Sequence, residues 1–153
     1  MAASPDDADF LAGEPPHEGF AAVEGWRHLP VTAFSALLGP IHVRGEPGDR
    51  IVALDCGPQI GNDRVGNVHG GALMTFADMA LGIRVADAVG HRTMATVQLT
   101  YNFAGGVKVG TRLTCNAELV RQTSQLVFVR GLFEADSKVV GSAEGIFRVF
   151  EPE

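Results

Sequence analysis

Residues 69–83 constrain the fold of this chain more than any other segment, because they read HGGALMTFADMALGI and carry one acidic side chain. Apolar or small residues occupy every face of a helix drawn through them, which is typical of a helix buried on all sides. Asp78 is the single ionisable residue between Gly70 and Ile83. A carboxylate in that setting must be paired, hydrogen-bonded, shifted in pKa or open to a cleft, since burying it unpaired is costly. The segment therefore predicts a core helix with Asp78 as a candidate functional residue.

The start of this predicted helix is the second unusual feature of the chain. His69, Gly70 and Gly71 stand where the first backbone N–H groups of a helix have no acceptor within the helix itself. Two glycines add no side-chain bulk, so a ligand oxygen can approach those donors at the positive end of the helix dipole. These residues predict an oxyanion-binding backbone site. The alternative is that the glycines only permit close packing against a sheet.

Length and charge predict a single domain with a mildly acidic surface. The chain has 153 residues, 46% of them hydrophobic, and a formal net charge of −6, which suffices for one self-contained core. Residues 1–19 hold five acidic residues and no basic one, so the rest of the chain carries a formal charge of −1. We expect a disordered acidic tail over residues 1–19 and one domain over residues 20–153. Without a basic cluster or a long apolar run, we expect neither a nucleic-acid partner nor a membrane partner.

The pattern of cysteines and histidines does not favour metal or thiol chemistry. Cys56 and Cys115 lie far apart and form no CxxC motif, so we expect reduced, buried thiols in a cytoplasmic protein. The five histidines form no HxxxH or HExxH pair, and no P-loop or GxSxG motif is present. We expect no metal and no cofactor.

Strand-like alternation dominates both sides of the helix. Residues 41–44 and 51–56 flank a turn rich in glycine and proline. Four longer alternating segments follow the helix, at residues 93–103, 111–121, 125–135 and 139–150. Short turns join them, so we expect each strand to pair antiparallel with the next. The pattern predicts an α+β fold in which a curved antiparallel sheet of about five to six strands wraps one long helix.

Two smaller patterns refine this prediction. Pro30 suits the first turn of a short helix that ends at Gly39-Pro40. One face of the last strand is small and apolar, as a sheet needs to be where a helix seats closely against it. That face consists of Val139, Gly141, Ala143, Gly145, Phe147 and Val149.

The sequence resembles the hotdog-fold thioesterases, in particular the acyl-CoA thioesterases of the phenylacetate-degradation type. The motif that carries the resemblance is His69-Gly70-Gly71, followed by Asp78 on the same helix and by the strand Thr96-Val-Gln-Leu-Thr-Tyr-Asn-Phe103. The resemblance covers most of residues 30–150. It implies hydrolysis of an acyl-CoA thioester to a free acid and CoASH, with coenzyme A present only as part of the substrate. It also implies a homodimer that pairs into a homotetramer.

The resemblance assigns a role to each residue of the motif. The Gly70 N–H group polarises the thioester carbonyl, His69 orients it, and Asp78 acts as general base or as nucleophile. Thr96 stands where a hydroxyl group of this family often assists the attacking water. The alternative for Thr96 is an ordinary strand threonine.

Further candidates concern binding of the substrate. Relatives often carry an asparagine before the HGG motif, and here Asn62, Asp63 and Asn67 all lie in a loop that is one residue longer. Gly71 is a second backbone candidate at the start of the helix. Phosphates of the coenzyme A tail need a local cation, and Arg121 beside Thr123 and Ser124 offers a cation with hydroxyls at a strand end. The alternative for these three residues is a solvated turn.

Two other functions on the same fold compete with hydrolysis. A hotdog dehydratase would use a catalytic histidine with an acid placed for proton removal from carbon, and Asp78 nine residues after His69 fits hydrolysis better. A non-enzymatic acyl-CoA sensor would need a DNA-binding domain, for which residues 1–29 are too short and too acidic. Aryl and medium-chain acyl groups both remain open.

Helix geometry predicts that the site is shared between two chains. Nine residues place His69 and Asp78 about 13.5 Å apart along a helix and about 180° apart around it. One straight helix therefore cannot bring both to one thioester. Two helices packed side by side and antiparallel about a two-fold axis can do so, and they create two identical sites.

Overall fold

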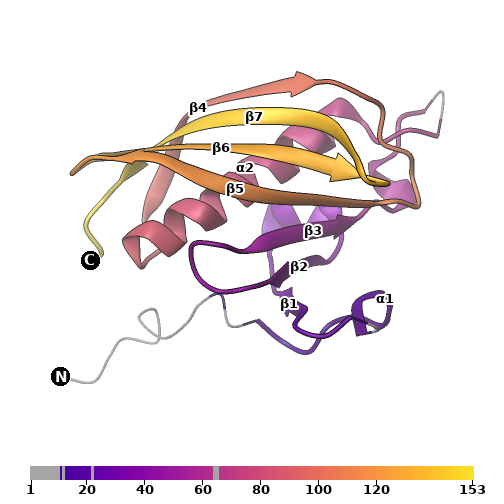
Figure 1. The fold of residues 1–153 in the computed structure, drawn as a ribbon, viewed down its shortest axis with the longest axis horizontal. Coiled ribbons are helices and arrows are strands. Elements are labelled where there is room, and N and C mark those ends of the chain that lie inside the picture. Colours follow the sequence, from indigo (N-terminus) through magenta and orange to yellow (C-terminus); the bar gives the residue numbers. More distant parts are fainter. Residues whose placement is uncertain (1–10, 12, 22, 64–65) are drawn as a thin grey trace.

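The computed structural model describes Leu11 and residues 13–21, 23–63 and 66–153. One antiparallel sheet of seven strands packs against a single long helix, α2, which crosses one face of the sheet (Figure 1). The strands follow the order β1-β2-β3-β5-β6-β7-β4. Among the described residues, no helix is long and apolar enough to cross a membrane.

The elements, in chain order, are α1 (Glu18–Ala21), β1 (Arg27–Leu29), the 3₁₀ helix η1 (Ala33–Leu38), β2 (Ile41–Arg44), β3 (Ile51–Asp55), the 3₁₀ helix η2 (Pro58–Ile60), α2 (Gly70–Val89), β4 (Met94–Phe103), β5 (Arg112–Gln122), β6 (Leu126–Ala135) and β7 (Lys138–Val149). The predicted sheet wrapped around one long helix is confirmed. The short strand β1 brings the number of strands to seven, above the five to six that we expected.

Helix α2 is buried on the side that faces the sheet, whereas Gly71 and Met74 on its other side are exposed, so the burial on all sides that the apolar wheel predicts is not found within one chain. Phe76, Ala77 and Leu81 are at most 1% exposed, and strands β4 to β7 all pack against the helix. Leu81 sits against two glycines of the sheet. A Cβ atom at Gly145 would lie 3.1 Å from the Leu81 side chain, and one at Gly131 would lie 3.5 Å from it. The small face predicted for the last strand therefore does seat the helix.

The helix continues six residues beyond the predicted end at Ile83, up to Val89. Asp87, in its last turn, is bound by groups of the β2–β3 hairpin. Arg50 Nε lies 3.0 Å from Asp87 Oδ2, and the Gly48 N–H group donates to the same oxygen at 3.0 Å. Both side chains of this ion pair are 3% exposed. A carboxylate is unfavourable near a helix C-terminus, and this pair compensates for it.

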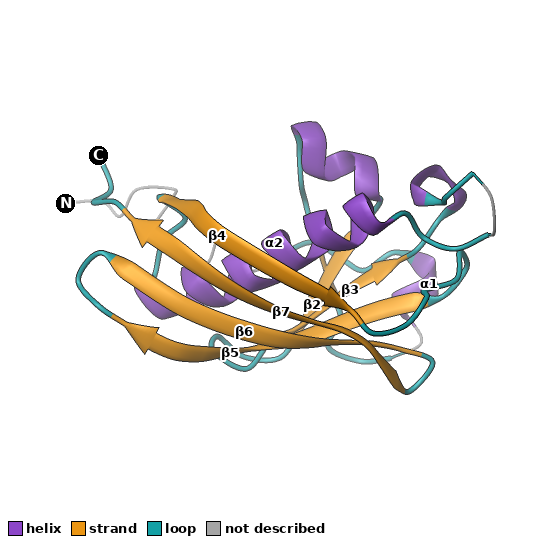
Figure 2. Ribbon diagram, turned by 90° about the horizontal axis from the view of Figure 1, so that it is seen from above, coloured by secondary structure: helices purple, strands orange, loops and turns teal. Residues whose placement is uncertain are grey.

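Strand β4 does not pair with β5, contrary to the expectation for consecutive strands. It pairs with β7 instead, from Met94↔Val149 to Phe103↔Gly141, and forms one edge of the sheet (Figure 2). The segment between β4 and β5 runs back to the loop that precedes α2. Val107, 1% exposed, accepts a hydrogen bond from the Val68 N–H group at 2.7 Å. These contacts explain why a short segment is not a hairpin turn here.

The described part of residues 1–19 makes defined contacts with the sheet, although Leu11 is its only buried residue, so the expected disordered tail stays a prediction for the residues outside the described part. We call the described residues from Leu11 to Thr32 the N-terminal arm. Glu14 exchanges backbone hydrogen bonds with His28 at 2.6 and 2.8 Å, and Arg112 Nη2 donates to the Gly19 carbonyl at 2.8 Å. Residues 1–10 and 12 lie outside the described residues. The high acid content of residues 1–19 hid the contacts made by the few apolar residues near them.

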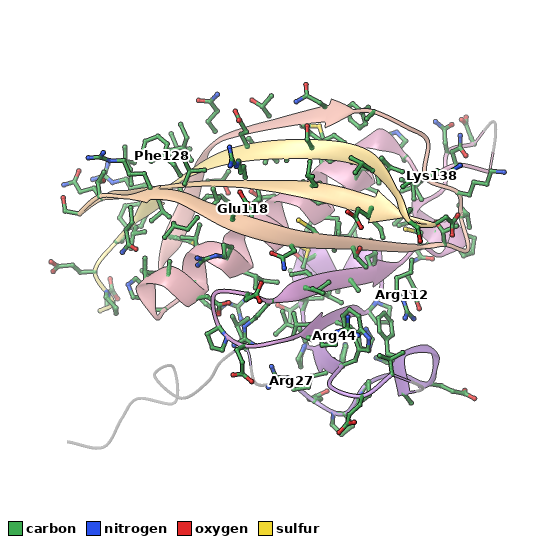
Figure 3. All side chains as sticks on the ribbon, viewed as in Figure 1. Arg27, Arg44, Arg112, Glu118, Phe128 and Lys138 are labelled. Carbon is green, nitrogen blue, oxygen red and sulfur yellow. The ribbon has the colours of Figure 1, made fainter. Side chains whose placement is uncertain are left out.

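A buried histidine holds the arm to the sheet. His42 of β2 is fully buried, stacks on Phe20 at 3.6 Å between ring centroids, and accepts a hydrogen bond from the His17 N–H group at Nε2, 3.0 Å away. Burial, as the largest cause, together with the neighbouring His28 and His17, lowers the pKa of His42 from 6.5 to about 4. Asp55 acts in the opposite direction, and Arg112, labelled in Figure 3 on this side of the molecule, lowers the pKa.

We predict that the free energy of unfolding falls as the pH drops from about 6.5 to about 4. The unfolded chain binds a proton at His42 in this window and the folded chain does not, so stability rises with pH there, by about 3 kcal/mol in full. Urea unfolding at several pH values measures this slope. His42→Leu should flatten the slope, whereas the control His91→Gln should keep it. An unchanged slope in folded His42→Leu would contradict the assignment.

Candidate active site

The start of α2 presents one free backbone donor. His69 is the N-cap residue, and its Nδ1 atom accepts a hydrogen bond from the Gly71 N–H group at 2.9 Å. Neutral His69 therefore carries its proton on Nε2. In the described part of the chain, no group accepts a hydrogen bond from the Gly70 N–H group. Gly70, and not Gly71, thus has the N–H group available for a ligand oxygen.

Both glycines have a steric reason to lack a side chain. A Cβ atom at Gly71 would lie 3.1 Å from Nδ1 of His69 and would disturb the cap. A Cβ atom at Gly70 would lie 3.3 Å from the ring of Phe103. Close packing and a free donor are therefore combined at this helix end, so the two interpretations of the glycine pair are compatible.

Asp78 is half-buried on α2 and is hydrogen-bonded to Thr96 of β4. The Thr96 hydroxyl group donates to Asp78 Oδ1 at 2.6 Å, a short, charge-assisted contact. Thr96 is the only described residue that forms a hydrogen bond with this carboxylate. The second oxygen, Oδ2, is left for a water molecule or a substrate.

A β-bulge turns Thr96 toward the helix. The pairing of β4 with β7 shifts between Thr96 and Gln98, so Val97 is an extra residue in the strand. Thr96 pairs with the inward-facing Phe147, while Leu99 pairs with the inward-facing Gly145. Strict alternation would have placed Thr96 with Gln98 on the outer face. Bulges beside active sites often re-aim a side chain in this way.

Asp78 and Thr96 line a cavity of about 400 Å³ between α2, the start of β4 and the N-terminal arm. The remaining lining residues are Leu11, Leu29, Pro30, Val31, Thr32, Ser35, Met79, Gly82, Ile83, Ala86, Arg92, Met94 and Phe147. The residues of the N-terminal arm that line this cavity were not predicted from the sequence. The small residues Gly82 and Ala86, spaced four residues apart after Asp78, were a signal for the floor of this cavity.

The start of the helix lines a different hollow. His69 and Gly71 border a groove of about 300 Å³ together with Thr75 and the exposed side chains of Phe34 and Leu37. Residues of η1 border both hollows. One chain therefore brings Asp78 and Thr96 together but does not bring His69 into their cavity.

The loop before α2 holds Asn62, Asp63 and Asn67, the three candidates for the asparagine that relatives carry before the HGG motif, and it lies outside the cavity of Asp78. Asn62 and Asp63 are exposed, and the Asn62 N–H group donates to the Asn67 carbonyl at 2.6 Å. Asn67 forms a bridge with Lys108. None of the three lines the cavity of Asp78.

The predicted phosphate-binding residues form the turn between β5 and β6. This turn lies at the end of the sheet opposite the N-terminus of α2 (Figure 1). The Thr123 hydroxyl group accepts a hydrogen bond from the Leu126 N–H group at 2.9 Å, which stabilises the turn itself. Arg121 and Ser124 are exposed at the same turn. Arg121 thus offers a cation next to the turn, whereas the Thr123 hydroxyl group already bonds to the backbone of the turn.

Both cysteines are free and buried, as expected. Burial raises the pKa of Cys115 to about 12, and burial together with Asp55 raises the pKa of Cys56 to about 11. Both side chains are thiols at neutral pH, which is unsuitable for a nucleophile.

A larger hollow of about 670 Å³ opens on the outer face of the sheet beside Glu118 and Glu144, and none of the predicted site residues lines it.

Comparisons with known proteins identify the family and the fold of the chain. The family model described as the thioesterase superfamily matches residues 65–142, which include α2, β4, β5 and β6. A Pseudomonas aeruginosa protein named as a candidate esterase is 28% identical over 114 residues, covering 74% of this chain and 85% of that protein.

Two solved structures show the same fold. The phenylacetic acid degradation protein PaaI of Escherichia coli superposes with a TM-score of 0.67 at 21% identity, covering 78% of this chain and 86% of that chain. A phenylacetic acid degradation-related protein of Ralstonia eutropha JMP134 superposes with a TM-score of 0.69 at 26% identity, covering 78% of this chain and 92% of that chain. With the hotdog fold confirmed and more than half of its length matched by the family model, the chain belongs to the thioesterase superfamily.

Proposed function

We propose that this protein hydrolyses an acyl-CoA thioester to a free acid and CoASH. The observation that carries the proposal is the 2.6 Å hydrogen bond from Thr96 to Asp78 in a cavity that is also lined by apolar side chains such as Leu29 and Phe147. An acid, a hydroxyl group and space for an apolar acyl group meet there. Membership of the thioesterase superfamily supports the reaction type, and the choice of an acyl-CoA substrate rests on the resemblance of the HGG motif and Asp78 to the acyl-CoA thioesterases of the phenylacetate-degradation type.

In the general-base route, Asp78 activates a water molecule. The Thr96 hydroxyl group donates a hydrogen bond to Asp78 Oδ1, so the Thr96 oxygen can accept a hydrogen bond from the water molecule. Asp78 Oδ2 then takes a proton from that water molecule. The water oxygen bonds to the thioester carbon, and the Gly70 N–H group stabilises the oxyanion. The C–S bond then breaks, and the proton on Asp78 passes to the departing sulfur.

In the nucleophilic route, an oxygen of Asp78 bonds to the carbonyl carbon, the C–S bond breaks, and CoA leaves as a thiolate that takes a proton from water. Water then hydrolyses the acyl anhydride to the free acid and the Asp78 carboxylate. A single-turnover reaction in heavy-oxygen water separates the two routes. Label in the Asp78 carboxylate indicates an anhydride that water attacks at the Asp78 carboxyl carbon. Label only in the released acid is the result expected for the general base, and trapping of the anhydride with hydroxylamine then distinguishes it from an anhydride that water attacks at the acyl carbon.

The proposed site combines Asp78 and Thr96 of one chain with His69 and Gly70 of a second. Helix α2 is continuous from Gly70 to Val89, so about 13.5 Å along the axis and about half a turn around it separate His69 from Asp78. The two ends line different hollows of one chain. A two-fold pair with antiparallel helices places the helix start of one copy beside Asp78 of the other. Such dimers can pair further into a tetramer.

The coenzyme A tail needs a cation, and Arg121 is the residue that we assign to it. The turn that follows Arg121 borders the beginning of β4, because Val149, next to Phe150, donates to the Gln125 carbonyl at 2.8 Å, and Phe150 donates to the Thr93 carbonyl at 2.9 Å. Ser124 adds a hydroxyl group there, while Thr123 stabilises the turn.

Release of CoASH from a panel of aryl and straight-chain acyl-CoAs tests the proposed reaction. Steady turnover of at least one substrate class is the expected result. Tight binding of acyl-CoAs without turnover across the whole panel would support an acyl-CoA sensor on the same fold and would contradict hydrolysis.

We predict that Asp78→Asn lowers turnover by about 10² to 10⁴-fold, the range expected for loss of a positioned general base. The amide has nearly the same size and removes a half-buried charge, so the protein should still fold. Asp136→Asn is the matched control, because Asp136 is exposed in a turn at φ 51°, a conformation that asparagine also adopts. Full activity of Asp78→Asn would move the acid role to another residue such as Asp63.

We predict that Thr96→Val lowers turnover while Thr96→Ser largely retains it. Valine matches threonine in shape but cannot donate to Asp78 or hold the water, whereas serine keeps the hydroxyl group. Initial rates at saturating substrate, with a thermal melt for each variant, measure the effect. Equal activity of the valine and serine variants would reduce Thr96 to an ordinary strand threonine.

We predict that a mixed dimer of Asp78→Asn and Gly70→Pro chains regains about half of wild-type activity, because one of its two sites is intact. Proline removes the N–H group, and it is favoured at the first position of a helix after an extended residue. His69 has that extended conformation, with φ −63° and ψ 136°. Differently tagged chains are co-expressed, and the mixed dimer is isolated and assayed.

The control for this experiment is Gly70→Ala, which adds the same contact with Phe103 but keeps the N–H group. It should retain more activity than Gly70→Pro. A verified mixed dimer that remains as inactive as its folded parents would disprove the shared site.

A further inference from the structure

The cavity beside Asp78 has one wall that lies outside the part of the chain matched by the family model. That model begins at residue 65, whereas Leu11, Leu29 and Val31 line the cavity from the N-terminal side. Leu11 is 3% exposed and Leu29 is 4% exposed, and both belong to the main hydrophobic core. The wall is therefore apolar.

This wall is fixed to the rest of the fold. Leu29 lies in β1, where it pairs with Ile41 of β2. The arm is also held by Arg112, whose guanidinium group lies 3.5 Å from the ring centroid of Phe20 and donates to the Gly19 carbonyl. Arg112 is itself bound to Asp55 at 2.7 Å. The arm is thus a packed part of the fold.

The floor of the cavity extends along α2 from Asp78 toward the C-terminus of the helix. Gly82 and Ala86 follow Asp78 at intervals of four residues and line the same cavity, so they lie on the same side of the helix over about 12 Å. Both are small and leave space above the helix. Met94 and Phe147 form the opposite side. The cavity thus has apolar side chains on its floor and walls, while Thr32, Ser35 and Arg92 add polar groups to its lining.

We propose that the acyl group lies along α2 over Gly82 and Ala86, and that Leu11 and Leu29 of the N-terminal arm set the greatest chain length that fits. This inference rests on the proposed function, because the reacting carbonyl is placed beside Asp78. The substrate class is an acyl-CoA with an apolar acyl group, and the arm is its specificity-determining element.

Three variants change the cavity in opposite directions. Leu11→Ala removes three carbon atoms from the wall, and it should move the preferred acyl chain to a length greater by about two to three carbons. Leu29→Ala is the second variant with the same expected direction. Gly82→Ala adds one carbon to the floor, where its Cβ atom meets the Phe147 ring at an ordinary 3.7 Å. It should shorten the preferred chain and stabilise the helix. Val23→Ala is the matched control, because Val23 belongs to the arm, is 44% exposed and does not line the cavity.

Two measurements are made on the full chain and each variant. The first is kcat/KM for straight-chain acyl-CoAs from butyryl-CoA to palmitoyl-CoA. The second is the Kd of the corresponding free fatty acids, measured by calorimetry, which does not depend on turnover. Each methylene group that gains a buried position should improve either quantity by about four-fold. Thermal melts show whether each variant is folded.

The outcomes separate the two proposals. Opposite shifts of the length profile in Leu11→Ala and Gly82→Ala, with Val23→Ala unchanged, support the assigned role of the arm. Length-dependent binding of fatty acids that shifts in this way, without release of CoASH from any acyl-CoA, supports the arm and overturns the proposed function. Profiles that are the same in the wild-type protein and in all folded variants overturn the role of the arm, whether or not CoASH is released.

Discussion

The fold depends on a helix without a polar face. Because apolar or small side chains surround α2 from Gly70 to Ile83, with Asp78 as the exception, the sheet must cover the helix from several directions. Strands β4 to β7 do so by curving around it. Close approach requires missing side chains on the sheet, and Gly131 and Gly145 provide them where Leu81 seats. The N-terminal arm covers part of the apolar surface that the strands leave uncovered, and its buried residues Leu11 and Leu29 belong to the core.

The position of Asp78 follows from the same constraint. A carboxylate on a fully covered helix would have to be neutral or paired with a cation. Here the sheet ends at β4, and the arm approaches from the other side, so a cavity remains where the carboxylate meets one hydroxyl group and open space. Asp87 shows the contrasting solution on the same helix, since it is 3% exposed and paired with Arg50. Asp78, which has no cationic partner among the described residues, is the acid to which we assign chemistry, whereas Asp87 with its partner Arg50 stabilises the fold.

The elements themselves follow from local patterns, and their arrangement does not. The apolar wheel of residues 69–83 and the alternation of the later segments were sufficient to predict one long helix and most of the strands. The alternation of apolar and polar residues could not predict the bulge at Val97. The extra residue moves the Thr96 side chain to the other face of the sheet, and nothing in the residue pattern of the strand indicates it. Chain order could not predict that β4 pairs with β7, since the pairing depends on Val107 and Val68 meeting beside the helix start. The burial of Leu11 could not be predicted, because the acidic residues around it indicate a solvated segment and because Leu11 packs beside a cavity formed by distant segments.

The two halves of the proposed site are kept apart by the regularity of α2. Its N-terminus is fixed by the His69 cap and by the contact between Gly70 and Phe103, so the free donor at Gly70 cannot move toward Asp78 without breaking both. The helix contains no proline that would kink it, and its one interior glycine, Gly82, lies beyond Asp78. A bend that joins the two ends is therefore unavailable within one chain. A second copy solves this geometric problem, since β4 is an edge strand whose outer side is unpaired among the described strands and lies next to the helix. A catalytic site built in this way would be lost on dissociation of the dimer even if each chain stayed folded, because the acid and the oxyanion donor have no single-chain route to the same carbonyl group.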